Sequence, residues 1–152
     1  MPNSQPKNRC QELIDAVWTM TLATTGDTGP WSAPVYYLYR DTRFYFFSSP
    51  HSRHILEGDG RPCAASIFRV HECVDHLEGI QMNGTIQSQK SGIRSAGAAG
   101  AYARRFGIPV PGSDFLAFFQ NAFHARLYAF LPDQVYHMDN GKGFGNREMI
   151  HL

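Results

Sequence analysis

The sequence has almost no imbalance of charge and no apolar run long enough to span a membrane. Lys and Arg number 14 against 13 Asp and Glu, which leaves a formal net charge of +1. The basic residues are scattered singly or in pairs, so they do not form the positive surface that nucleic acids or anionic membranes attract. A membrane-spanning helix would need about 20 predominantly apolar residues in succession. We therefore expect neither a nucleic-acid partner nor a membrane partner.

Cysteine is scarce, and the cysteines present show no pairing pattern. Cys10, Cys63 and Cys73 are odd in number and have no Cys-x-x-Cys spacing. The opening segment MPNSQPKNRCQ is polar and does not contain the apolar core of a secretion signal. These features predict free thiols in a reducing compartment, and therefore a cytoplasmic protein.

Aromatic residues, in contrast, are abundant. They make up 13% of the 152 residues and gather in segments with strand character. A chain of this length buries a hydrophobic core without help from disulfides or metal ions. We expect one domain over residues 1–152, with aromatic side chains packing its core or partly lining a site.

The pattern of apolar and turn residues predicts a mainly β domain with peripheral helices. Leu13, Ile14, Val17 and Trp18 have helical spacing, which predicts a helix over 9–18. A second helix is expected at 51–58, with Gly58 as its C-cap, and a third over 91–107. A fourth would begin at Ser113 or Asp114. Strands are expected at 19–25, 31–39, 43–49, 62–70, 79–87 and 125–137. Six strands joined mostly by short turns favour a small antiparallel barrel.

Small hydroxyl and basic residues gather where the third predicted strand gives way to a helix. They are Ser48, Ser49, Ser52, Arg53 and His54. The first turn of a helix has free N–H groups, and an arginine binds a phosphate bidentately, so the group suits the phosphate of a planar cofactor. In an alternative interpretation the serines only cap the helix and Arg53 forms a surface ion pair.

Two further strands carry candidate contacts to a flat ring. Pro34 lacks an N–H and therefore favours an edge strand, whose open backbone groups suit the polar end of a flavin. Gln81 and Asn83 alternate onto one face of the strand 79–87, opposite Ile80 and Met82. Under the alternative, Pro34 blunts an exposed edge and the two amides lie on a solvated face.

The loop HECVDH and the glycine-rich tail are the remaining segments of interest. His71, Cys73 and His76 do not have the His-Glu-x-x-His zinc spacing and lie in a predicted turn, so we assign no metal site. In the tail, glycines flank Lys142 and Phe144 and would allow a close approach to a ligand on which Phe144 stacks. A flexible terminus is the alternative.

Taken in order, these segments resemble the pyridoxamine 5′-phosphate oxidase-like family of FMN-binding split barrels. The resemblance runs from the first helix through LATTGDTGPWSAPVYYLYRDTRFYFFSSPHSRHILEGDGRPCAASI to GIQMNG, which is more than half of the chain. The ending GFGNREMI is similar to that of an uncharacterised bacterial subgroup of this family. The resemblance implies a six-stranded antiparallel split β-barrel.

The resemblance also implies a homodimer with FMN between the subunits. The phosphate would contact Ser48, Ser49, Ser52, Arg53 and His54. The isoalloxazine ring would face the backbone of Ala33, Pro34, Val35 and Tyr36, with Gln81 nearby. Lys142 and Phe144 would reach the flavin from either subunit.

One departure from the family limits the expected chemistry. Pyridoxamine phosphate oxidases end in a motif with Trp and Arg-His that binds the substrate phosphate, whereas the tryptophans here are Trp18 and Trp31. We do not expect vitamin B6 oxidation. The leading hypothesis is an FMN-dependent oxidoreductase for another small molecule, or an electron carrier. The alternatives are a non-catalytic flavin or haem binding or storage protein, and a barrel that acts only as an interaction domain.

Overall fold

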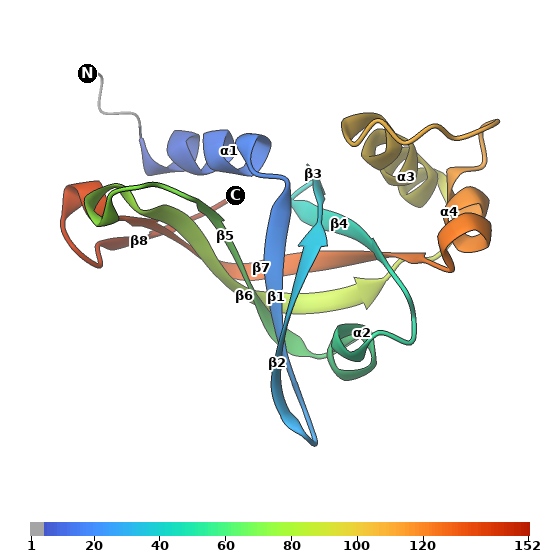
Figure 1. Ribbon diagram of the computed structural model, residues 1–152, viewed down its shortest axis with the longest axis horizontal. Coiled ribbons are helices and arrows are strands. Elements are labelled where there is room, and N and C mark those ends of the chain that lie inside the picture. Colours follow the sequence, from blue (N-terminus) through green and yellow to red (C-terminus); the bar gives the residue numbers. More distant parts are fainter. Residues whose placement is uncertain (1–4) are drawn as a thin grey trace.

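A single curled antiparallel sheet dominates the computed structural model, which describes residues 5–152 (Figure 1). Its strands are β1 (Thr19–Gly26), β2 (Gly29–Tyr36), β3 (Leu38–Arg40), β4 (Arg43–Ser48), β5 (Pro62–Arg69), β6 (Glu78–Ser88), β7 (Arg126–Asp139) and β8 (Arg147–Ile150). The α-helices are α1 (Pro6–Ala16), α2 (Arg53–Gly58), α3 (Ile93–Arg105) and α4 (Phe115–Phe123). Two short 3-10 helices, η1 (Val74–His76) and η2 (Asn140–Lys142), lie in the connections. None of the helices in residues 5–152 is long and apolar enough to cross a bilayer.

The strands follow the order β2-β1-β5-β6-β7-β4-β3, and β8 pairs with β7 outside this path. Every pair is antiparallel. The predicted mainly β antiparallel fold is confirmed, with eight strands within residues 5–152 in place of the six expected. One additional strand arises because the predicted strand 31–39 divides at Tyr37, whose buried hydroxyl donates to the Ile14 carbonyl at 2.8 Å. The other, β8, lies in the glycine-rich tail.

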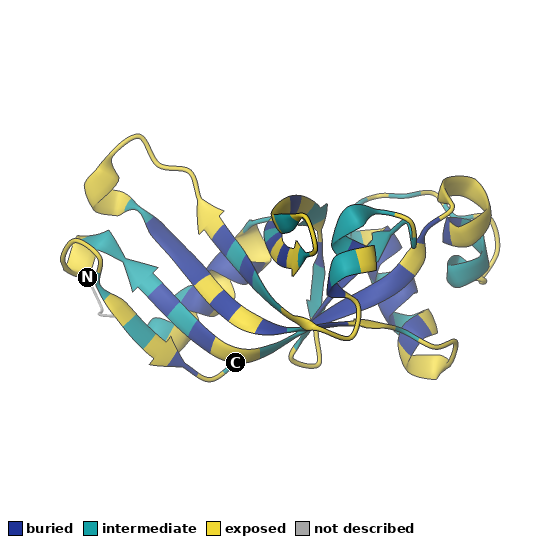
Figure 2. Cartoon of the chain, turned by 90° about the horizontal axis from the view of Figure 1, so that it is seen from below, coloured by how far each residue is buried: buried dark blue, intermediate teal, exposed yellow. Residues whose placement is uncertain are grey.

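The core lies inside the curl of the sheet, and the strands reach it with alternate residues (Figure 2). On β6, Ile80 and Met82 are buried while Gln81 and Asn83 are exposed, as the sequence pattern predicts. Leu13 and Ile14 of α1 close one side of the same core. Both faces of the aromatic-rich strand β4 are packed. Phe44 and Phe46 join this core, and Tyr45, on the opposite face, packs beneath α3.

A polar cluster is buried where α1 meets β6 and β7. The Glu78 carboxylate contacts His137 Nε2 at 2.9 Å through Oε1. Arg9 donates to the same carboxylate with two nitrogens, at 3.1 Å to Oε1 and 2.8 Å to Oε2. This cluster ties α1 to the end of the sheet that lies away from α4.

Local irregularities follow particular residues. The β6–β7 register shifts between Asn83 and Gly84, where Gly84 faces Pro132. A Cβ on Gly84 would overlap the Leu131 carbonyl oxygen, which explains the glycine. Asp114 caps α4 by accepting from the Ala117 N–H at 3.0 Å, as predicted.

The helix α2 ends on Gly58 as predicted, but the prediction that Gly58 is its C-cap is wrong. Gly58 is the last residue of α2, and the cap is Asp59 in extended backbone. A Cβ on Gly58 would lie 2.8 Å from Thr24 Cγ2 and 3.0 Å from Ile86 Cδ1. The glycine therefore permits α2 to approach the sheet closely.

Candidate functional site

Three of the predicted phosphate-binding side chains converge at the end of β4. The Ser48 hydroxyl lies 2.9 Å from Ser52 Oγ and 2.8 Å from His54 Nε2. The Ser52 hydroxyl donates to the Ser49 carbonyl at 2.6 Å. We call Ser48, Ser52 and His54 the cradle. Its three polar tips belong to residues only six positions apart in the sequence, so local chain geometry brings them together.

The turn between β4 and α2 sets the shape of the cradle. The Ser52 N–H donates to the Ser49 carbonyl at 3.1 Å, and the His51 N–H donates to Ser49 Oγ at 3.2 Å. The Ser49 hydroxyl therefore holds the turn rather than pointing to the other hydroxyls. Ser52 stands at the N-cap of α2 but makes no side-chain cap bond, so its hydroxyl remains part of the cradle.

The cradle carries little positive charge of its own. Burial lowers the pKa of His54 below its ordinary value of 6.5, so the imidazole is neutral at physiological pH. Two hydroxyls and a neutral imidazole carry no formal charge, and Ser52 would have to release the Ser49 carbonyl before it could donate to an anion. A dianion bound here would find no cationic group among these three side chains.

Arg53 is engaged away from the cradle. Its Nε donates to Glu57 at 2.8 Å, and its Nη2 donates to Thr28 Oγ1 at 2.8 Å and to the Gly29 carbonyl at 3.3 Å. The guanidinium also lies 4.5 Å from the centre of the Trp31 ring. Arg53 thus joins α2 to the β1–β2 turn, which matches the ion-pair alternative left open by the sequence.

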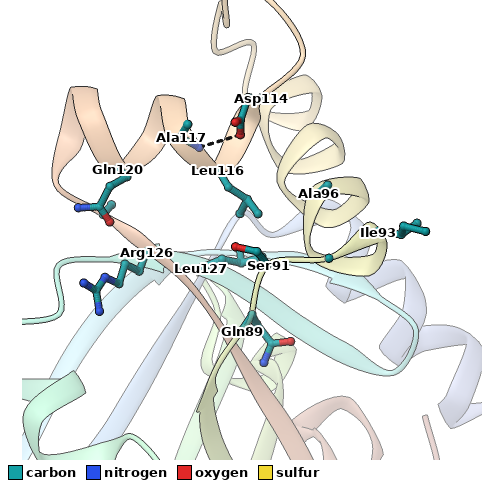
Figure 3. A pocket seen from close by; sticks show the side chains of 12 residues that line it. Gln89, Ser91, Ile93, Ala96, Asp114, Leu116, Ala117, Gln120, Arg126 and Leu127 are labelled. Atoms are coloured by element: carbon teal, nitrogen blue, oxygen red, sulfur yellow. Dashed lines mark hydrogen bonds between the residues drawn. The ribbon is translucent and has the colours of Figure 1, made fainter.

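Arg126, which the sequence analysis did not single out, lies directly opposite Ser48. The β4–β7 ladder pairs these two residues at the start of β7. Arg126 is exposed, and no ion pair or side-chain hydrogen bond involves it within residues 5–152 (Figure 3). No local motif marks this residue, because its relation to the cradle depends on a pairing between distant strands.

A groove of ≈760 Å³ opens beside Arg126, between α3, α4 and the start of β7 (Figure 3). Leu116, Ile93 and Leu127 line its apolar part, and Gln89 and Gln120 add amides.

The predicted ring contacts lie on an exposed edge. β2 ends the strand order, so Pro34 occupies an edge strand as expected. Pro34 and Tyr36 are exposed, Val35 is half-buried and Ala33 is buried. Gln81 is exposed on β6, and its Oε1 accepts from Arg147 Nε of β8 at 2.8 Å.

The tail forms a defined loop at the far end of β7. Lys142 pairs with Glu148 at 3.0 Å, and Asn140 accepts from the Gly145 N–H at 3.1 Å. Phe144 is 91% exposed. Within one chain this loop lies at the end of β7 opposite to the cradle (Figure 1), so the structure does not bring Lys142 and Phe144 to Ser48.

Comparison with known proteins connects this arrangement to a family. Residues 6–111 match the family described as pyridoxamine 5′-phosphate oxidase, which is more than half of the chain. The chain belongs to this family. The family resemblance predicted from the sequence is thereby confirmed, although no curated protein sequence matches the chain.

Solved structures of the same architecture share little sequence with this family member. A conserved hypothetical protein from Mycobacterium tuberculosis is 14% identical with a TM-score of 0.72, covering 96% of this chain and 91% of its own. A haem-binding protein from Mycobacterium smegmatis is 14% identical with a TM-score of 0.71, covering 99% of this chain and 59% of its own. An FAD-binding protein from Mycobacterium smegmatis is 11% identical with a TM-score of 0.63, covering 95% and 96%. These similarities confirm the split-barrel fold.

Proposed function

We propose that this protein binds FMN and acts as a flavin-dependent oxidoreductase on a small molecule or as an electron carrier. The observation that carries the proposal is the cradle, in which Ser48, Ser52 and His54 converge at the end of a strand. Hydroxyl and imidazole groups in this arrangement suit the oxygens of a phosphate ester. Membership of the pyridoxamine 5′-phosphate oxidase family supports a flavin as the bearer of that phosphate.

In this proposal the chain binds and orients the flavin, which supplies the redox chemistry when bound. Ser48, Ser52 and His54 contact the phosphate, and Ser49 fixes the turn that presents them. Arg53 would join them only by leaving Glu57. The backbone of Ala33, Pro34, Val35 and Tyr36 on the open edge of β2 faces the isoalloxazine ring, with Gln81 nearby.

We further propose a homodimer with the flavin at the subunit interface, in which Lys142 and Phe144 approach from the partner subunit. Exposed aromatic side chains support an interface, since Tyr36 is 55% exposed and Phe144 almost fully so. The free thiols favour a reducing location, and we place the protein in the cytoplasm.

A non-catalytic role in flavin or haem binding or storage is the second candidate. It is favoured by the similarity to the haem-binding protein from Mycobacterium smegmatis and to a haem storage protein from Vibrio cholerae, which is 11% identical with a TM-score of 0.68 and covers 86% of this chain and 93% of its own.

An absorbance spectrum of the purified protein, followed by mass identification of the released ligand, tests these functions. We expect oxidised-flavin bands and released FMN, with bleaching when a nicotinamide donor or a reduced partner is added. A haem spectrum would refute the flavin assignment. Bound flavin that no donor reduces would refute the oxidoreductase role and favour storage. Ser48→Ala should reduce FMN affinity, whereas Ser113→Ala on an exposed loop should not.

A further inference from the structure

We propose that Arg126 supplies the cation of the cradle, so that the chain selects phosphorylated ligands over their unphosphorylated counterparts. The inference rests on the proposed function and adds to it a residue from the last long strand. Arg126 would bind the phosphate from one side, with the hydroxyls and the imidazole on the other.

The strand register places Arg126 on the same face as the cradle. Directly opposite residues in an antiparallel ladder point to the same side, with Cβ atoms about 4.5–5.5 Å apart. The neighbouring pair on this face, Phe46 and Tyr128, follows the rule, since their rings stack with centres 5.8 Å apart. Ser48 and Arg126 form the next pair on this face, at the end of the ladder where Arg126 is exposed.

The charge of Arg126 is available to a ligand. No carboxylate forms an ion pair with it within residues 5–152, and the side chain is exposed. Burial is the largest cause of the raised pKa of Tyr128; Asp59 raises this pKa further and Arg126 lowers it, so both charges act on the same hydroxyl. The Asp59 carboxylate already accepts from the Ser88 N–H at 2.9 Å.

Arg53 is the weaker candidate for the same role. To reach a phosphate it would give up its ion pair with Glu57 and its hydrogen bond to Thr28. It would also leave the Trp31 ring. The Arg126 side chain has no ion pair to give up within residues 5–152, so binding through Arg126 requires no rearrangement of the α2 contacts. Arg53 instead acts as a positioning residue that holds α2, and with it His54, against the β1–β2 turn.

Titrations with FMN and with riboflavin, which lacks the phosphate, test the proposal. Quenching of flavin fluorescence would be followed for the full-length wild-type chain and for Arg126→Ala, Arg53→Ala and Arg94→Ala. Arg94 is an exposed arginine on α3 and serves as the matched control. Thermal unfolding of each variant verifies that it is folded.

We expect Arg126→Ala to weaken FMN binding about 10- to 100-fold, as for a lost charge-assisted hydrogen bond, with riboflavin affinity changed less than about twofold. Arg94→Ala should change neither affinity. The proposal is overturned if Arg126→Ala weakens both ligands equally or leaves FMN affinity intact. It is also overturned if the phosphate-specific loss appears only in Arg53→Ala.

A second readout separates this inference from the proposed function. If the wild-type chain binds neither flavin, the flavin function fails. Inorganic phosphate would then be titrated while the ring signals of His54 are followed by NMR, with His54→Gln identifying those signals. A shift in the wild type that is lost in Arg126→Ala supports the cation role without a flavin. No shift in the wild type, or an equal shift in both proteins, refutes it.

Discussion

Glu78→Ala should lower the free energy of unfolding by about 1–4 kcal/mol, because it removes the centre of the buried polar cluster. His137 is 1% exposed, so its ring nitrogen loses the only acceptor it contacts within residues 5–152 and cannot regain water. Leaving such a group unsatisfied costs about 1–3 kcal/mol. The Arg9 side chain is 40% exposed and can be rehydrated, so the lost ion pair adds only about 0–1 kcal/mol.

Chemical unfolding monitored by circular dichroism measures this change, and Glu148→Ala is the matched control. Glu148 forms an ion pair with Lys142, but its side chain is 40% exposed, so we expect a loss below about 1 kcal/mol. In a heating experiment Glu78→Ala should lower the Tm by roughly 2–16 °C for a domain of this size. If the two alanine variants are destabilised equally, the buried cluster does not stabilise the fold as argued.

Three further predictions concern single residues. Burial lowers the pKa of His54 in the folded chain, so the unfolded chain binds a proton at a higher pH than the folded chain does. The free energy of unfolding should therefore fall as the pH drops below about 6.5. His54→Gln should flatten that part of the stability profile, and an unchanged slope would contradict the assignment. Gly84→Ala should cost at least about 2 kcal/mol in denaturant unfolding, because its Cβ would overlap a backbone carbonyl of β7, whereas Gly92→Ala, with open space around it, should be well tolerated. A thiol reagent should label Cys73 rapidly and Cys63 and Cys10 slowly, because burial raises the pKa of the Cys63 thiol to about 11 and that of the Cys10 thiol to about 12. Rapid labelling of the Cys73→Ser variant would refute this.

The sequence predicted well the features that depend on neighbouring residues. The alternation on β6, the cap at Asp114 and the convergence of Ser48, Ser52 and His54 each arise within a few positions of the chain. Periodicity and capping preferences carry information at that range.

Features set by contacts between distant segments were not predictable in the same way. The hydrogen bond from Arg53 to Thr28 depends on where the β1–β2 turn packs, and the role of Gly58 depends on Thr24 and Ile86. β8 exists because β7 offers it an edge. Arg126 is marked only by the register of β4 against β7, which no local pattern reveals.

The β4–β7 pairing has a consequence for when a cofactor can be acquired. The hydroxyls belong to the first half of the chain and Arg126 to the last fifth, so the complete site forms only after β7 has entered the sheet. A nascent or truncated chain ending before residue 126 would have the serines but neither the guanidinium nor the strand that supports them. Ligand binding would therefore indicate that the fold is complete, and the bound molecule would stabilise only the completely folded chain.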